Sequence, residues 1–337
     1  MAGRVRWLLI LMIAAGLASA AAWWGWREYH AFETRPLAQP GAVLVLERGQ
    51  GLKQLVGQLR TAGHSDAPEF FWRLLAERMG ASARLQAGEF RIDANMTPRA
   101  LLQSIVDGRV VQYRFTIIEG WRFAELRVAL AADPVLESTL GGLDDAEVLR
   151  RIGASETHAE GRFLPDTYFF PRGFQDVDLL QRAYWAQKKV LEQAWQARAE
   201  DLPLANAEEA LILASLIEKE TGRAEERPTI GGVFVNRLRI GMRLQTDPTV
   251  IYGMGAAFDG NLRRRDLETD TPYNTYTRFG LPPTPIAMPG RDAILAATQP
   301  ARTEAYYFVA KGDGTHQFSR TLEEHNRAVR RYQLRQG

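Results

Sequence analysis

The sequence predicts an α+β fold with an N-terminal transmembrane helix, a small α+β module and a larger mixed α+β domain. Three observations predict it: an uncharged apolar run near the N-terminus, a close alternation of strand-like and helix-like patterns after it, and then long amphipathic segments joined by glycine- and proline-rich connections. The 337 residues have room for about two domains. We expect an anchor at 1–30, a linker at 31–42, the small module at 43–118 and the larger domain at 119–337.

The N-terminal run extends without a charge from Trp7 to Trp26. As a helix, these roughly 20 residues are long enough to cross a bilayer core of about 30 Å. Arg4 and Arg6 precede the run, which favours a cytoplasmic N-terminus and an exported remainder, and Trp23, Trp24 and Trp26 are expected at the far headgroup layer.

A cleaved signal peptide is the alternative, because Ala18, Ser19 and Ala20 have the small-residue pattern of a cleavage site. The run is longer than the roughly 7 to 15 apolar residues of a typical signal core. We therefore favour a retained single-pass anchor, followed by the polar, proline-bearing linker.

The small module is predicted from short alternating patterns. In chain order we expect a strand at 43–47, a helix carrying Leu52, Leu55, Val56 and Leu59, a helix at 68–80 ended by Gly80, a strand at 88–92, a helix capped by Thr97 and Pro98, and a strand at 110–118. Strands and helices mixed within about 75 residues indicate a small α+β unit.

The larger domain is predicted from amphipathic periodicity and capping signals. We expect a helix at 178–195, a helix started by Asn206 and Glu209 and closed by Gly222, a helix from Pro228 to Gly241, a proline-rich loop at 277–290, a hairpin turning at 312–314, and a final helix boxed by Thr321 and Glu324.

The segment LILASLIEKETG (211–222) carries two carboxylates with different environments on a helical wheel. Ile212, Leu213, Leu216 and Ile217 form an apolar stripe, and Glu220 falls in its middle, whereas Glu218 points the other way. A carboxyl group among leucine and isoleucine is desolvated, which raises its pKa and suits a general acid.

The alternative for Glu220 is a place just past the core, paired with Arg223 or Arg227, and periodicity alone does not separate the two. Glu218 by itself is expected to be a surface group or a group that supports Glu220.

Polar side chains gather in two later segments. Gln245, Thr246 and Asp247 follow one another, and so do Asn274, Thr275 and Tyr276. Amides, hydroxyls and aromatic rings are the groups that recognise sugars. Turn chemistry at Asp247-Pro248 and around Asn274 is the simpler explanation when these segments are taken alone.

Composition and spacing exclude several classes of function. The net charge of +2 gives no basic field for nucleic acid, and the absence of cysteine excludes thiolate catalysis. Ser215 and Lys219 are spaced S-x-x-x-K rather than S-x-x-K, no G-x-S-x-G occurs, and the histidines lack H-E-x-x-H spacing. We therefore expect no metal, no cofactor and no nucleic-acid partner.

Five segments in order resemble the YceG-like, or MltG, family of endolytic murein transglycosylases. They are EGRFLPDTYFF (160–170), ASLIEKET (214–221), NRLRIGMRLQTDPTVIYG (236–253), YNTYTRFGLPPTPIAMPG (273–290) and YFVAKGDGTHQFSRTLEEHN (307–326), and the resemblance runs from the anchor to the C-terminus. It implies a single-pass inner-membrane protein facing the periplasm, with a small LysM-like module.

The resemblance also implies a lyase of the carbon–oxygen class that acts on peptidoglycan, with Glu220, the second glutamate of E-K-E, as its catalytic acid. Gln245, Thr246, Asp247, Asn274, Thr275 and Tyr276 are then expected to line the glycan groove, with Glu218 in support. Glycan strands are the implied substrate, and peptidoglycan synthases (penicillin-binding proteins) are the implied partners.

Two other functions stay open at this stage. One is a hydrolytic muramidase with Asp247 as the second carboxylate, since ordinary glycosidases use a pair of carboxyl groups. The other is a murein-binding scaffold for a synthase, without catalysis.

Overall fold

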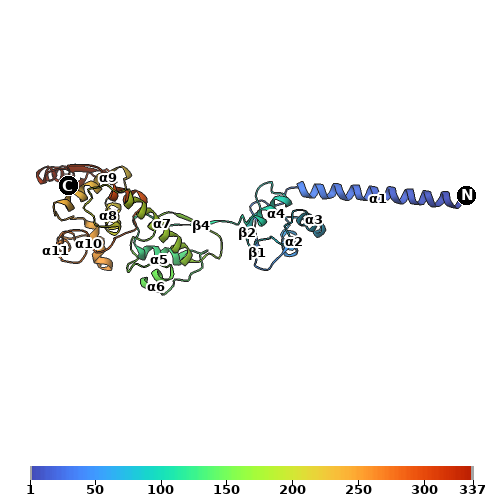
Figure 1. Ribbon diagram of the computed structural model, residues 1–337, viewed down its shortest axis with the longest axis horizontal. Helices are drawn as coiled ribbons and strands as arrows, with labels where there is room; N and C mark the ends of the chain where they lie inside the picture. Colours follow the sequence, from blue (N-terminus) through green and yellow to red (C-terminus); the bar gives the residue numbers. More distant parts are fainter. Residues whose placement is uncertain (1, 335–337) are drawn as a thin grey trace. The chain divides into compact units, whose positions relative to one another are not determined.

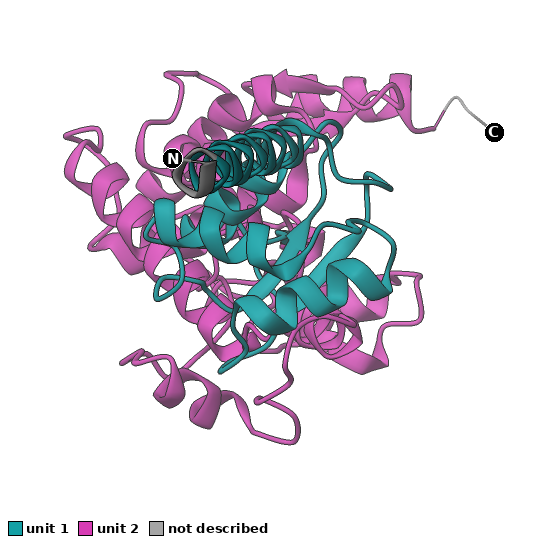
Figure 2. Ribbon diagram, turned by 90° about the vertical axis from the view of Figure 1, so that its right-hand side faces the viewer, with its two compact units in different colours: residues 1–113, 170–172 teal, residues 114–169, 173–337 magenta. Residues whose placement is uncertain are grey.

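The computed structural model describes residues 2–334, which form two compact units (Figures 1 and 2). Unit 1 comprises the residues up to Tyr113 together with Phe170–Arg172, and unit 2 comprises Arg114–Phe169 and the residues from Gly173 onward. Both units contain helices and short strands, so the expected mixed α+β fold with an N-terminal apolar helix is confirmed at this level.

Unit 1 begins with helix α1 (Ala2–Thr34), which extends away from the rest of the unit (Figure 1). Within the described residues it is the one helix long and apolar enough to cross a membrane, over Arg6–Thr34. Its large apolar side chains between Trp7 and Trp26 are mostly exposed, as expected of a surface that meets lipid. The helix therefore fits a single-pass anchor.

The end of α1 is part of the core of unit 1. Tyr29 and Phe32 are buried, and α1 packs against α3 (Glu69–Arg78) and α4 (Pro98–Val106). The residues after the helix are also held, because Leu37 is buried and its N–H donates to the Met96 carbonyl at 2.8 Å. Part of the segment expected to be a linker thus packs on the module, while the domain boundaries themselves stay predictions.

The rest of unit 1 follows the predicted order of strands and helices. Strands β1 (Val43–Leu46) and β2 (Gly88–Arg91) pair antiparallel with Val43 opposite Arg91, and α2 (Leu52–Thr61) and α3 lie between them in the chain. Thr97 caps α4 by accepting the Ala100 N–H, as its spacing predicted. Trp72 and Leu59 lie at the centre of this core. The likeness to a LysM domain stays a prediction.

The chain passes between the units along a second two-stranded sheet. Strand β3 (Tyr113–Thr116) is shorter than the strand pattern at 110–118 indicated, and it pairs with β4 (Thr167–Phe170), for which no strand had been predicted. Between them unit 2 places α5 (Phe123–Ala132) and α6 (Asp145–Arg151).

Unit 2 is mainly helical. After β4 it contains α7 (Asp176–Gln196), α8 (Ala207–Glu220), α9 (Arg227–Arg239), α10 (Asp247–Met254), α11 (Arg264–Glu268), α12 (Arg291–Thr298), the hairpin β5 (Tyr307–Ala310) and β6 (His316–Ser319), and α13 (Leu322–Tyr332), with short 3-10 turns at Ala224–Glu226 and Gly255–Ala257. The hairpin turns at Gly312 and Gly314, both with positive φ, as predicted.

Helix α8 lies inside unit 2. It packs against α7, α9, α10 and α12, and every residue from Ala210 to Glu218 is buried. Asn206 caps its start by accepting the Glu209 N–H, whereas the Glu209 carboxylate accepts from Ala205 instead of the cap residue. A helix that is apolar around most of its circumference is stable only when surrounded in this way.

The end of α8 differs from the prediction that Gly222 closes the helix. The helix ends at Glu220, and Thr221 is already extended with φ −147°. Gly222 does not adopt the left-handed conformation of a glycine C-cap. The chain therefore leaves the helix directly at the carboxylate.

The contact between α9 and α12 requires glycine. A Cβ at Gly231 would meet the carbonyl oxygen of Ala296 in α12 at 2.5 Å, and one at Gly232 would meet that of Ala301, in the segment after α12, at 2.4 Å. Backbone atoms cannot move aside individually. A larger residue at either position would therefore force α9 away from the backbone it contacts.

Gly231→Ala is expected to destabilise the chain by about 1–3 kcal/mol, because the added methyl group overpacks the contact between α9 and α12. Gly141→Ala is the matched control, since that site is exposed and its nearest atom lies 3.7 Å from the added Cβ. Chemical denaturation of the full chain in detergent micelles measures both. Equal stabilities of the two variants would contradict the close-packed contact.

Candidate active site

Glu220 is the last residue of α8, and its side chain is only partly exposed although the helix before it is buried. Burial raises the pKa of its carboxyl group to about 7, and the negative charge of Asp247 acts in the same direction. The Thr246 hydroxyl donates to Glu220 Oε1 and opposes the shift, as do the charges of His316 and Arg237. The group can therefore hold or release a proton near neutral pH.

Glu218, one half-turn earlier on the helix, has a different partner. Its Oε1 pairs with the Arg227 guanidinium at 2.9 Å, and its Oε2 accepts the Gly290 N–H at 2.9 Å. Burial raises the pKa of Glu218, while the Gly290 N–H and the charge of Arg227 act against that rise. The carboxyl is more deeply buried than that of a surface residue, so the surface alternative for Glu218 is wrong.

The two arginines that the sequence had suggested as partners of Glu220 both have other partners. Arg227 bonds Glu218 and Glu119, each at 2.9 Å, and Arg223 donates to the carbonyls of Asp313 and Gly314. Neither arginine pairs with Glu220. The wheel identified Glu220 on its apolar side but missed the burial of the opposite face of α8, because α8 is surrounded by helices from other parts of the chain, namely α7, α9, α10 and α12.

In residues 245–247, the hydroxyl of Thr246 contacts Glu220, while the polar side chains before and after Thr246 are exposed. Gln245 has a left-handed backbone with φ 49°, and the side chains of Gln245 and Asp247 are exposed, while Thr246 is 2% exposed. The Thr246 N–H donates to Thr275 Oγ1 at 3.1 Å, and Thr275 Oγ1 also contacts Thr249 Oγ1 at 2.9 Å. These contacts fix the orientation of Thr246.

Residues 274–276 divide into structural and accessible groups. The buried Asn274 side chain donates to backbone carbonyls at the end of α11 and just after it, and its Oδ1 accepts the Tyr276 N–H at 2.8 Å. Asn274 therefore has the turn-forming contacts of the simpler explanation. The partly exposed Tyr276 donates its hydroxyl to Asp247 Oδ1 at 2.6 Å. Of the six predicted groove residues, Gln245, Asp247 and Tyr276 have accessible side chains.

Two further residues near Glu220, His316 and Arg237, were not predicted from the sequence. His316 begins β6, and its Nδ1 lies 2.7 Å from Glu226 Oε2. Arg237, in α9, is buried and donates to the carbonyls of Tyr306 and Leu244. Local pattern gave no signal for either, because the hairpin and α9 reach Glu220 only through tertiary packing.

Glu160 is a second carboxyl group that the sequence did not single out. It is buried in a loop, accepts the Phe123 N–H at 2.9 Å and accepts the Tyr252 hydroxyl at 3.2 Å. Burial raises its pKa to about 7, against the effects of these bonds and of Arg122. A loop residue has no periodicity from which such burial could be predicted.

Among residues 2–334, no group of three or more His, Asp or Glu side chains is arranged to hold a metal ion. The carboxyl group of Glu220 can transfer a proton, and the hydroxyl and amide groups around it can bind a polar substrate.

The chain matches the model of the YceG-like family over residues 44–331. It is 32% identical over 270 residues to a protein of Bacillus subtilis (strain 168) named endolytic murein transglycosylase, covering 75% of this chain and 74% of that protein. A protein of the same name from Streptococcus pneumoniae (serotype 2, strain D39) is 32% identical over 176 residues, which is 50% of this chain and 31% of that longer protein.

A solved structure has a similar fold. The crystal structure of a YceG-like protein from Listeria monocytogenes aligns with a TM-score of 0.53 and 26% identity, covering 86% of this chain and 98% of that one. The similarity thus extends over most of the chain rather than over α8 alone.

Thr246→Val is expected to raise the pKa of Glu220 above about 7, because the hydroxyl that stabilises the carboxylate is removed while the shape is kept. Thr246→Ser keeps the hydroxyl and should leave the pKa near that of the wild type. The pKa is measured by ¹³C NMR of glutamate-labelled chain, with the signal assigned from Glu220→Gln. An unchanged or lower pKa in Thr246→Val would show that this bond does not control the carboxyl.

Arg227→Met is expected to destabilise the chain by about 3–5 kcal/mol, because it leaves the Glu218 carboxylate buried without its charge partner. Adding Glu218→Gln to the same chain should recover a large part of that loss. Denaturant unfolding of both single variants and the double variant gives the coupling energy. Purely additive effects would rule out the ion pair as the source.

Proposed function

The chain belongs to the YceG-like family, and we propose that it is an endolytic murein transglycosylase that cleaves the MurNAc–GlcNAc bond inside nascent peptidoglycan strands. The observation that carries the proposal is the Glu220 carboxyl, whose pKa is raised to about 7 at the end of a buried helix while its side chain stays partly exposed. The relatives named endolytic murein transglycosylase support the same activity.

Glu220 acts first as the general acid. Its protonated carboxyl donates to the glycosidic oxygen as the bond from that oxygen to C1 of the muramyl residue breaks. Because Thr246 donates to Oε1, the proton is held on Oε2, and the carboxylate left after donation keeps a hydrogen bond. Arg237 and His316 add positive charge that stabilises the ionised stage.

Glu220 then acts as the base. The Glu220 carboxylate takes the proton of the muramyl C6 hydroxyl while that oxygen bonds to C1, which closes a 1,6-anhydro ring. The acid is regenerated and no water is consumed, so one principal carboxyl group suffices. A carboxyl with a pKa near neutrality can serve both steps, since neither the proton-loaded nor the proton-free form is strongly disfavoured.

In this proposal some of the other predicted site residues bind the glycan, and the rest hold the loops and the end of α8 in place. Gln245, Asp247 and Tyr276 have accessible polar groups and bind the glycan directly. Thr246 touches Glu220, while Thr275 and Asn274 hold the two loops in place. Glu218 supports the end of α8 through Arg227 and Gly290.

We also propose the cellular setting. Helix α1 is retained as an anchor in the inner membrane, with the arginines before it in the cytoplasm and unit 2 in the periplasm. Peptidoglycan synthases are the proposed partners, because the strands to be cut are the ones that these enzymes polymerise at the membrane.

A hydrolytic muramidase is the second candidate, favoured by one observation. Asp247 is exposed, and its charge acts on Glu220, so a second carboxylate is present near the acid. Tyr276 donates to that carboxylate. Hydrolysis would give products one water heavier than the anhydro products, so mass spectrometry separates the two reactions. A scaffold without catalysis predicts intact strands.

Glu220→Gln is expected to lower cleavage of uncrosslinked glycan by at least about 1,000-fold, since the amide cannot deliver a proton. The wild-type rate should fall as the pH rises through about 7, because the acid must carry its proton, and in Thr246→Val the fall should move to higher pH. Rates are measured by chromatography and mass analysis of the products.

Gln245→Ala is the control, since it removes an accessible amide without touching the acid and should raise KM more than it lowers kcat. Substantial cleavage by Glu220→Gln would refute the assigned acid. A product one water heavier than the anhydro product would show that the reaction is hydrolysis rather than elimination.

A further inference from the structure

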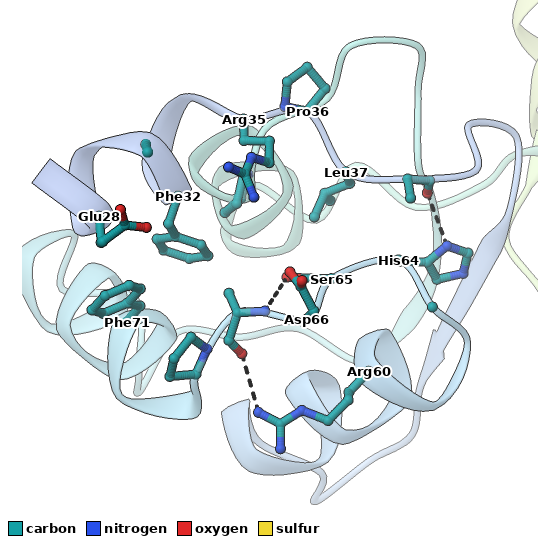
Figure 3. Close-up of a pocket in the computed structure, with 16 residues that line it drawn as sticks. Glu28, Phe32, Arg35, Pro36, Leu37, Arg60, His64, Ser65, Asp66 and Phe71 are labelled. Atoms are coloured by element: carbon teal, nitrogen blue, oxygen red, sulfur yellow. Dashed lines mark hydrogen bonds between the residues drawn. The ribbon is translucent and has the colours of Figure 1, made fainter.

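Unit 1 contains a cavity of about 540 Å³ between the end of α1 and the loop that joins α2 to α3 (Figure 3). Arginine and acidic side chains are mixed in its lining, namely Glu28, Arg35, Arg60 and Asp66, so its charges favour no single class of ligand. Unit 2 contains a feature with more specific contacts. It is the buried carboxyl group of Glu160, which the proposed reaction does not use.

Glu160 joins segments of unit 2 that are far apart in the chain. Its Oε1 accepts the N–H of Phe123, the first residue of α5, at 2.9 Å, and its Oε2 accepts the hydroxyl of Tyr252, in α10, at 3.2 Å. The next residue, Gly161, packs so closely on the proline-rich loop that an added Cβ would lie 2.6 Å from the Cβ of Pro285. The carboxyl group is therefore held in place between α5 and α10.

Tyr252 connects this carboxyl group to the proposed glycan groove. The rings of Tyr252 and Tyr273 lie 4.9 Å apart. Gly253, the next residue of α10, approaches the same tyrosine so closely that an added Cβ would lie 3.1 Å from the Tyr273 Cβ. Tyr273 directly precedes the groove residues 274–276, and α10 begins at Asp247. Both groove segments thus start within a few residues of the contact between α10 and Tyr273.

We propose that Glu160 is a positioning residue for the reaction, whose carboxylate holds α10 and the loop before Asn274 in the arrangement that binds the glycan. It acts through Tyr252 and not by contact with the sugar. This inference rests on the proposed function, because the groove that it positions is the one assigned to the glycan there.

Both protonation states of Glu160 are populated near neutral pH. Burial raises its pKa to about 7, while the N–H groups of Phe123 and Gly161, the Tyr252 hydroxyl and the charge of Arg122 oppose that rise. Above this pH the carboxylate accepts from Phe123 and from Tyr252, and hydrogen bonds to an ionised acceptor are the stronger kind. Below it, the proton is placed on Oε2, because the Phe123 N–H can only donate to Oε1.

The protonated oxygen no longer accepts from the Tyr252 hydroxyl, so the hold on α10 weakens as the pH falls through about 7. Glycan binding should therefore strengthen as the pH rises. This direction is opposite to that of the acid step, which requires the proton on Glu220.

Binding of uncrosslinked glycan to the full chain carrying Glu220→Gln, measured by calorimetry, tests the proposal without cleavage. The dissociation constant should fall about three- to tenfold as the pH rises through about 7, which is roughly the value of one hydrogen bond. Adding Glu160→Gln should leave the weaker binding at every pH. An amide keeps an oxygen for the Phe123 N–H and turns an N–H towards Tyr252, as the protonated acid does.

A second measurement does not depend on glycan. In the same Glu220→Gln chain with labelled tyrosine, the NMR signals of Tyr273 and Tyr276 should shift with a midpoint near the Glu160 pKa of about 7. Glu160→Gln and Tyr252→Phe should each remove that shift. Tyr252→Phe keeps the carboxyl group and removes only the hydroxyl, so the test does not depend on how well Glu160→Gln folds.

Glu156→Gln is the matched control, since Glu156 also accepts a tyrosine hydroxyl, that of Tyr184, at 2.8 Å in the same unit but away from α10. It should leave both readouts unchanged. Binding that is independent of pH while Glu160 is present, or tyrosine shifts that persist in Glu160→Gln or Tyr252→Phe, would overturn the proposal. A chain that binds no glycan at any pH would count against the proposed function, and the tyrosine signals would still decide the role of Glu160.

Discussion

The site depends on keeping one carboxyl group protonated near neutral pH at a place a substrate can reach. Burying the whole residue would remove it from the substrate, and exposing it would return its pKa to the ordinary range. Unit 2 meets both requirements by enclosing α8 up to Glu218 and ending the helix at Glu220. The extended Thr221 then takes the backbone away, so the carboxyl lies at the margin of the core.

Two glutamates two residues apart show how neighbours decide the state of a buried acid. Glu218 has a guanidinium and a backbone N–H, which favour its ionised form against burial. Glu220 has a neutral hydroxyl as its direct partner, and the nearby side chains of Arg237 and His316 are engaged by other groups. Burial raises the pKa of both carboxyl groups, but Glu218 is held in an ion pair whereas the direct partner of Glu220 is a hydroxyl.

The sequence predicted what is encoded locally. The Thr97 and Thr321 caps, the hairpin glycines and the apolar side of Glu220 all depend on residues a few positions apart, and all are found in the structure. Burial of the opposite face of α8, the contact from Arg237 and the loop-holding role of Asn274 depend on segments far apart in the chain. Glu160 could not be found for the same reason, because its partners are Phe123 and Tyr252.

Helix α1 continues without a break into the core of unit 1, where Tyr29 and Phe32 are buried. Each residue added to the helix between Trp26 and Tyr29 would turn the module by about 100° around the axis of α1 and move it by about 1.5 Å along that axis. In the proposed membrane anchor, the number of residues in this stretch therefore sets both the height and the rotation of unit 1 relative to the lipid surface. If a flexible linker joined the helix to the module, the helix would fix neither the height nor the rotation of the module.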